Sequence, residues 1–220
     1  MDTRRNRLPA VLLAVAVFFF ILTVSIGLPI YIRPFYYSHI EALDLPAVSG
    51  FTADQIRTAY DEVLDYLTLP GKTFGTGEMA CSESAADHFA DCRVLFDLNA
   101  WVLLGSGAVI SVLLFLQRKG TVGPLKLGSR GGAFWGALAA VGLPLVVGSL
   151  AALDFNRAFV IFHSIFFPGK DNWIFNWYND QIIRVLPQQF FMNCAILIGT
   201  GVLAISAGVI VWEIRKDKKG

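Results

Sequence analysis

Four long stretches without a charged residue limit what this chain can fold into more than any other feature of its sequence. They cover residues 8–32, 98–117, 131–153 and 188–212. A helix of about 20 apolar residues crosses the hydrocarbon core of a membrane, which is roughly 30 Å thick. Hydrophobic residues make up 55% of the chain and charged residues only 16%, a composition typical of membrane proteins. We therefore predict an all-α integral membrane protein with four transmembrane helices in a single membrane domain, residues 1–220.

The first stretch occupies the position of a signal peptide. Its 25 residues exceed the apolar core of a signal peptide, which is about 7–15 residues long. No small-x-small cleavage motif follows it. We therefore predict an uncleaved membrane anchor.

The charges divide unevenly between the segments that join the spans. If the spans alternate in direction, residues 1–7, 118–130 and 213–220 lie on the same side of the membrane. Together they carry eleven basic residues, including Arg4, Arg5 and Lys219, and three acidic residues. Segments 33–97 and 154–187 carry seven basic and fourteen acidic residues. Cytoplasmic segments of membrane proteins carry an excess of Lys and Arg. We therefore expect a plasma-membrane protein with both termini in the cytoplasm. The two other segments are expected to be extracellular and to form a cap at the membrane surface.

Several function classes are disfavoured by the same features. The basic residues gather at the chain ends and in one loop, a pattern that indicates orientation rather than nucleic-acid binding. No charge lies deep in a span, which argues against a proton relay or an ion pathway. Residues 71–73, Gly-Lys-Thr, lack the upstream glycine of a phosphate-binding loop, since Tyr66 stands in its place.

Residues 51–69 have the pattern of an amphipathic helix. Thr52 and Gln55 form a Thr-x-x-Gln capping box. The apolar stripe lies on the opposite side of the helix from an acidic polar face. Anionic lipid would repel this acidic face. We therefore favour packing of the helix on the protein itself over packing on the membrane surface. The stripe consists of Ile56, Tyr60, Val63, Leu64 and Leu67.

Residues 81–93 concentrate polar chemistry just before the second span. If Ser84 caps a helix that continues into this span, His88 and Asp91 share one face. A carboxylate one turn from an imidazole fixes its tautomer and raises its basicity. The alternative is a solvated helix start without catalytic function. A helix between Cys81 and Cys92 would hold them beyond disulfide distance, so both are expected to remain thiols.

His163 lies in an unusually aromatic segment. Five phenylalanines surround it within residues 155–167, so the segment must be buried in protein or set into the membrane interface. Loss of hydration disfavours the charged imidazole and leaves a neutral base. The alternative is a core histidine bonded to a carbonyl group.

The chain resembles the lipoprotein intramolecular transacylase (Lit) family of Gram-positive bacteria over nearly its whole length. The similarity rests on Ser-Glu-Ser-Ala-Ala-Asp-His-Phe-Ala-Asp-Cys-Arg (82–93), Asp-Tyr-Leu (65–67), Phe-His-Ser-Ile-Phe-Phe (162–167), Trp-Ile-Phe (173–175) and Leu-Pro-Gln-Gln-Phe-Phe (186–191). One departure is Asn176-Trp177, where Asp-Pro is expected, so this chain has no acidic side chain at position 176.

The resemblance implies an acyltransferase that moves the sn-2 acyl chain of a diacylated lipoprotein onto the α-amino group of its N-terminal cysteine. It implies membrane lipid as a partner, no cofactor and no metal. His88 and His163 would be the catalytic pair at the outer interface, one as base and one as acid, with His163 the preferred base. The supporting residues would be Asp87, Asp91, Ser82, Glu83 and Arg157.

Other mechanisms and functions remain open from the sequence. Ser82 or Ser84 would be the nucleophile if the acyl group passed through an acyl-enzyme. A membrane hydrolase would use the three histidines, His39, His88 and His163, as zinc ligands. A membrane scaffold or transport accessory would need none of these side chains.

Overall fold

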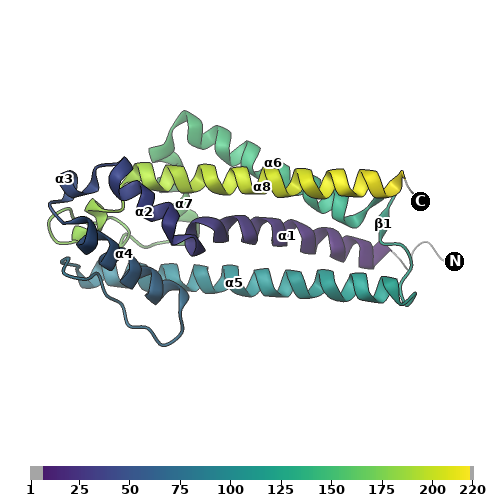
Figure 1. The fold of residues 1–220 in the computed structure, drawn as a ribbon, viewed down its shortest axis with the longest axis horizontal. Helices are drawn as coiled ribbons and strands as arrows, with labels where there is room; N and C mark the ends of the chain where they lie inside the picture. Colours follow the sequence, from purple (N-terminus) through teal and green to yellow (C-terminus); the bar gives the residue numbers. More distant parts are fainter. Residues whose placement is uncertain (1–6, 219–220) are drawn as a thin grey trace. The chain divides into compact units, whose positions relative to one another are not determined.

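The computed structural model describes residues 7–218, so Arg4, Arg5 and Lys219 of the charge pattern lie outside the described residues. Figure 1 shows the order of the elements. The helices are α1 (Arg7–Tyr31), α2 (Arg33–Ala42), α3 (Leu45–Ser49), α4 (Ala53–Thr68), α5 (Glu83–Arg118), α6 (Gly132–Leu153), α7 (Phe155–Phe166) and α8 (Gln188–Asp217). A 3-10 helix, η1, covers Gln181–Arg184. Strands β1 (Lys126–Leu127) and β2 (Arg130–Gly131) pair antiparallel.

Within the described part of the chain, four helices are long and apolar enough to cross a membrane: α1, α5, α6 and α8. They correspond to the four uncharged stretches of the sequence. Large apolar side chains remain exposed along all four, as expected where lipid tails cover a helix. Examples are Leu12, Val15, Phe115, Leu145, Ile196 and Val211.

The chain divides into two compact units. Unit 1 comprises residues 1–28, 99–149 and 196–220, and in it segments of α1, α5, α6 and α8 pack around a common apolar core. Gly132 and Gly136 let α6 approach α1 closely. A Cβ atom at these positions would lie 2.4 Å from the Ala10 carbonyl oxygen and 2.3 Å from that of Ala14. The glycine pair therefore serves helix packing, as small-xxx-small pairs do in membranes.

Unit 2 comprises residues 29–98 and 150–195. The predicted capping box is present at the start of α4, because Thr52 accepts from the Gln55 amide while the Gln55 side chain accepts from the Thr52 amide. The predicted apolar stripe of α4 is buried in this unit's core. Tyr36 stacks on Tyr60 with ring centroids 3.6 Å apart and donates to the Val185 carbonyl at 2.8 Å. α4 thus packs on its own protein, as expected.

An ion-pair cluster joins α2 to α4 in unit 2. Arg33 donates to Asp61 at 2.8 Å and to Asp65, and Lys72 pairs with Asp65 at 3.2 Å. Tyr37 also donates to Asp61. Asp65, the acidic residue of the Asp-Tyr-Leu motif, therefore links α4 to Arg33 of α2 and to Lys72.

Candidate active site

His88 lies in the second turn of α5. This helix begins at Glu83, and the Ser82 hydroxyl accepts a hydrogen bond from the Ala85 amide at 3.2 Å. The cap is thus Ser82 and not Ser84, so the expected helix start was two residues late. With Ser82 as cap, His88 faces inward and is 7% exposed.

His163 lies near the end of α7. Asp154 caps this helix by accepting from the Arg157 amide at 3.0 Å. His163 is 6% exposed, whereas Phe162 and Ile165 are 47% and 66% exposed. α7 therefore buries its histidine face and presents an apolar face outward, which suits a helix at a membrane interface.

The structure brings the two predicted histidines together within unit 2. Their ring centroids are 5.7 Å apart, with 33° between the ring planes. Aromatic rings surround the pair: Phe167 lies 4.9 Å and Phe175 5.6 Å from His88, while Phe159 lies 4.1 Å and Trp173 4.6 Å from His163. The two imidazoles are thus buried among aromatic side chains and have little contact with water.

The hydrogen bonds of His163 fix its tautomer. Nδ1 lies 2.8 Å from the Phe159 carbonyl oxygen, and because a carbonyl only accepts, Nδ1 must carry the proton. Nε2 therefore presents a lone pair. Burial lowers the pKa of His163, and the hydrogen bond to Phe159 offsets this only in part. At neutral pH His163 is an uncharged base.

The His88 ring has weaker partners. Nε2 lies 3.4 Å from Cys92 Sγ, one helical turn along α5. Nδ1 is buried and has no hydrogen-bond partner among residues 7–218. Cys92 is a residue that sequence reasoning missed as a neighbour of the site, although its position four residues after His88 places it on the same helix face.

Asn172 belongs to a small polar network near His88. The Asn172 amide lies beside the His88 ring. Its Nδ2 donates to Asp91 at 3.0 Å, and Asp91 also pairs with Lys170. Its Oδ1 is buried and, like His88 Nδ1, has no hydrogen-bond partner in the described chain. Asp91 is thus bonded to Asn172 and Lys170 and makes no hydrogen bond to His88 among the described residues, where we expected direct contact.

Asp180 anchors the start of α5 to the segment after Trp173. It is 4% exposed and accepts from the backbone amides of Ser82 and Asn176, each at 2.8 Å. Burial opposes ionisation, but the bonds from Ser82 and Asn176 outweigh it and hold the pKa of Asp180 below its usual range. Asn176 forms a turn by accepting from the Tyr178 amide. The ionised carboxylate of this segment thus belongs to Asp180.

The remaining predicted residues are exposed or, in the case of Ser82, half-buried. Asp87, Glu83 and Arg157 are exposed, and the structure shows no hydrogen bond or ion pair from their side chains to His88 or His163 within residues 7–218. Ser82 has its hydroxyl engaged in capping α5. Of the predicted site residues, the structure therefore places the rings of His88 and His163 side by side.

His39 belongs to a different part of unit 2. Its Nδ1 lies 2.6 Å from the Phe35 carbonyl oxygen, and its Nε2 lies 2.9 Å from Asn193 Nδ2. Both ring nitrogens are thus engaged by the protein, as in a structural histidine. Among the described residues, no group of three His, Cys, Asp or Glu side chains is arranged to hold a metal ion.

Comparisons with known proteins give a consistent result. A family model described as lipoprotein intramolecular transacylase Lit matches residues 11–191. A structure of the membrane integral lipoprotein intramolecular transacylase Lit from Bacillus cereus has a TM-score of 0.87 at 21% identity, covering 100% of both chains. A variant of that protein with one histidine replaced by alanine has a TM-score of 0.80 at 21% identity, over 99% of this chain and 97% of that one.

A further variant, with one histidine replaced by arginine, has a TM-score of 0.79 at 21% identity, over 98% of this chain and 95% of that one. None of the curated proteins matches the chain. The similarity to these structures confirms the predicted all-α integral membrane fold.

Proposed function

Because this chain belongs to the lipoprotein intramolecular transacylase Lit family, we propose that His88 and His163 carry out the acyl transfer. The protein is a membrane acyltransferase that acts within one lipoprotein molecule. It moves the sn-2 acyl chain of a diacylglyceryl group onto the α-amino group of the N-terminal cysteine, and the product is an N-acylated lyso-lipoprotein. The observation that supports this use of the pair is the 5.7 Å separation of two buried imidazole rings.

The reaction exchanges an ester for an amide. The amine nitrogen attacks the ester carbonyl carbon, a C–N bond forms and the C–O bond to the glyceryl group breaks. The α-ammonium group has a pKa of about 8 and must lose two protons in all. One of these ends on the departing glyceryl oxygen and the other is released. An amide is more stable than an ester, so no nucleotide is required.

Two neutral histidines account for both protons. His88 takes the first proton from the ammonium group and later gives it to the glyceryl oxygen. His163 takes the second proton through its Nε2 lone pair as the amine attacks, then releases it. This assignment follows the hydrogen bond between His163 Nδ1 and the Phe159 carbonyl, which keeps Nε2 free as a general base.

The aromatic surroundings favour transfer over hydrolysis. Phe159, Phe167, Trp173 and Phe175 lie within 6 Å of one histidine ring or the other. Such walls exclude water, which would otherwise compete with the amine for the ester. They also match the acyl chains of a lipoprotein. No serine is needed as an acyl carrier, since donor and acceptor belong to one molecule.

The proposal includes an orientation in the membrane. The excess of basic residues in 1–7, 118–130 and 213–220 supports cytoplasmic termini. Segments 33–97 and 154–187, which carry His88 and His163, would then lie at the outer face of the cell membrane. A diacylated lipoprotein anchored in the outer leaflet would meet the pair there.

Mass spectrometry of a defined lipopeptide tests the function. The purified protein is incubated with a diacylglyceryl lipopeptide that has a free α-amine. The expected product has the same mass, with one N-linked acyl chain and one acyl chain on the glyceryl group in its tandem spectrum. Hydrolysis would lower the mass by one acyl chain, and transfer from a separate phospholipid would raise it. Either result would contradict the proposal.

Two controls sharpen this experiment. A lipopeptide with a blocked α-amine has no acceptor and should remain unchanged. The matched protein control is His39→Ala, which removes a buried histidine bonded to Phe35 and Asn193. This variant should lose thermal stability, while its folded fraction still converts the substrate.

A further inference from the structure

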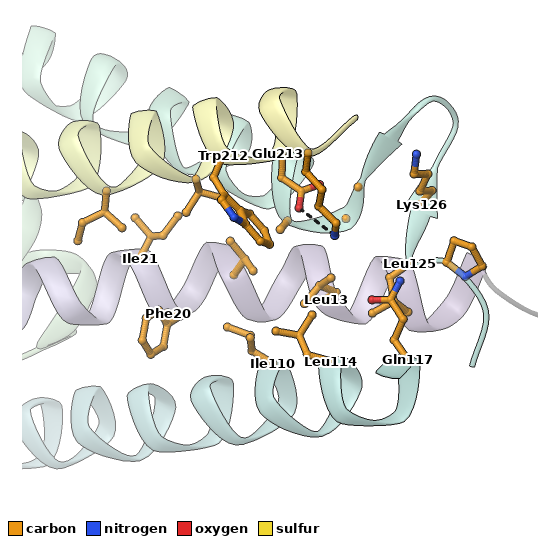
Figure 2. A pocket seen from close by; sticks show the side chains of 18 residues that line it. Leu13, Phe20, Ile21, Ile110, Leu114, Gln117, Leu125, Lys126, Trp212 and Glu213 are labelled. Carbon is orange, nitrogen blue, oxygen red and sulfur yellow. Dashed lines mark ion pairs between the residues drawn. The ribbon is translucent and has the colours of Figure 1, made fainter. Parts of the chain in front are cut away.

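The two buried histidines need a route by which a substrate can reach them. Both side chains are less than 8% exposed, so the ester and the amine of a lipopeptide cannot contact the rings in this conformation. Figure 2 shows a cavity of about 300 Å³, but it belongs to unit 1 and neither His88 nor His163 lines it. Some part of unit 2 that covers the histidines must therefore move before the reaction.

Residues 168–174, which follow α7, lie over the pair. The Trp173 ring is 4.6 Å from the His163 ring, centroid to centroid, and the Asn172 amide lies beside the His88 ring. Neither α5 nor α7 can move away and leave the pair intact, because each helix carries one of the two histidines. This segment can be displaced without separating the histidines.

Both ends of the segment are fixed in unit 2. Phe167, just before it, is 5% exposed, and Phe175, just after it, packs against the core of the unit. Further along, Asp180 accepts from the Ser82 amide at the start of α5. Near the first end, Gly169 has a φ angle of +74°, which glycine adopts without strain. This glycine provides a hinge at which the chain can change direction.

The middle of the segment is held to α5 through one carboxylate. Lys170 forms an ion pair with Asp91, and Asn172 donates to Asp91 at 3.0 Å. The other hydrogen bond from a side chain here, among the described residues, joins Trp173 Nε1 to the nearby Lys170 carbonyl. A segment with few buried side chains and one polar attachment can open locally. Most of its residues are exposed: Pro168, Gly169, Lys170, Asp171 and Ile174.

We propose that residues 168–174 form a lid over the histidine pair, which the contacts of Asp91 with Lys170 and Asn172 hold closed. The lid opens to admit the lipopeptide, and its closing excludes water from the ester. Asp91 thus controls access to the histidines from its place on α5. The purpose of the lid rests on the proposed function, whereas its opening can be measured without any substrate.

Chemical modification of the histidines measures this opening. Diethyl pyrocarbonate reacts with accessible, uncharged imidazoles, and peptide mass spectrometry gives its rate at each histidine of the purified full-length protein. Asp91→Ala removes both contacts that hold the lid. It should raise the rates at His88 and His163 about tenfold, as expected when hydrogen bonds to a charged group are lost. Unchanged rates at both histidines would overturn the proposal.

Two controls separate a lid from general loosening of the protein. Asp87→Ala makes the same substitution at an exposed position of α5 and should leave all rates at their wild-type values. His39 is the internal control, since Phe35 and Asn193 engage its ring and no part of the lid does. An equal rise at His39 in Asp91→Ala would contradict a lid over the pair.

A covalent link provides the converse test. In a variant without the natural cysteines, Asp91→Cys and Lys170→Cys are joined by a bismaleimide about as long as the Lys170 side chain. The joined protein should lose nearly all conversion of the lipopeptide, whereas either single-cysteine variant treated with the same reagent should keep most of it. Conversion at the full rate by the joined protein would overturn the proposal.

The two experiments distinguish failure of the lid from failure of the proposed function. If the wild type converts no lipopeptide, the proposed function is wrong, and the modification rates at His88 and His163 still decide whether a lid opens. If Asp91→Ala does not fold, the joined protein decides, because the link replaces the contacts that this substitution removes.

Discussion

The His88 ring in α5 lies 5.7 Å from the His163 ring in α7, centroid to centroid, and both side chains are less than 8% exposed. Two imidazoles at this distance can act on one substrate group without contacting each other. Their lone pairs differ, because His163 Nδ1 is committed to the Phe159 carbonyl whereas His88 has only the Cys92 thiol near Nε2. The pair is therefore asymmetric before any substrate binds.

The asymmetric pair predicts linked losses of activity. His88→Ala and His163→Ala should each lower the rate of lipopeptide conversion by about 10² to 10⁴, the usual contribution of a positioned acid or base. The double variant should lose little more, because residues that act as one unit fail together. Initial rates of all three variants measure this. Full turnover by His88→Ala would show that His88 has no catalytic function and that residues 81–93 only begin a helix.

Asn172→Ala is expected to act through His88. The substitution removes the amide beside the His88 ring that donates to Asp91, so the imidazole should lose its orientation. We expect kcat to fall about tenfold to a hundredfold, as for a displaced catalytic group, with a small change in KM. Asp87→Asn is the matched control, since Asp87 is exposed on the same helix. Equal effects of the two variants would contradict a positioning role.

The fold was predictable from the sequence where a local rule applied. Uncharged stretches identified the four membrane helices, and the Thr52–Gln55 capping box identified α4. Both Asp87 and Asp91 were nominated as supports for His88, although the three-residue spacing places only Asp91 on the face of His88 and Asp87 is exposed. The helix start was placed too late, since Ser82 and Ser84 both have capping chemistry.

The arrangement of the site residues was harder to predict from the sequence. The sequence nominated His88 and His163 but not their distance, which depends on how α5 and α7 pack in unit 2. Asn172 and Lys170 lie in a polar loop whose pattern carries no signal for a neighbour in α5. Asp180 was visible as a carboxylate after Trp173, but its bonds to the Ser82 and Asn176 amides are long-range contacts that no local periodicity encodes.

The lowered pKa of His163 predicts how stability depends on pH. An unfolded histidine has a pKa of about 6.5, and burial places the folded value lower. Between these values the unfolded chain binds more protons, so the free energy of unfolding should fall as pH falls below about 6.5. Above that pH, His163 should make no pH-dependent contribution to the free energy of unfolding. Thermal melting between pH 5 and 8 measures this.

His163→Gln provides the comparison for that measurement, because glutamine does not titrate. The variant should lose less stability than the wild type between pH 6.5 and 5. Parallel melting curves for the two proteins would show that His163 keeps its ordinary pKa. The wild-type reaction rate should in turn rise towards about pH 8, where the substrate ammonium titrates, because the base is already neutral at lower pH.

The proposed orientation predicts which loops react with a membrane-impermeant thiol reagent in intact cells. Cys81, Cys92 and Cys194 are the three natural cysteines, so the experiment starts from a variant that lacks them. Thr73→Cys, exposed in segment 33–97, should be labelled, whereas Thr121→Cys, exposed between α5 and β1, should not.

Both threonines are exposed, so a difference in labelling reports the side of the membrane and not burial. Permeabilised cells provide the control, because Thr121→Cys should then react as fast as Thr73→Cys. The opposite pattern in intact cells would place His88 and His163 at the cytoplasmic face. A lipoprotein anchored in the outer leaflet could not reach them there, and the positive-inside argument would fail for this chain.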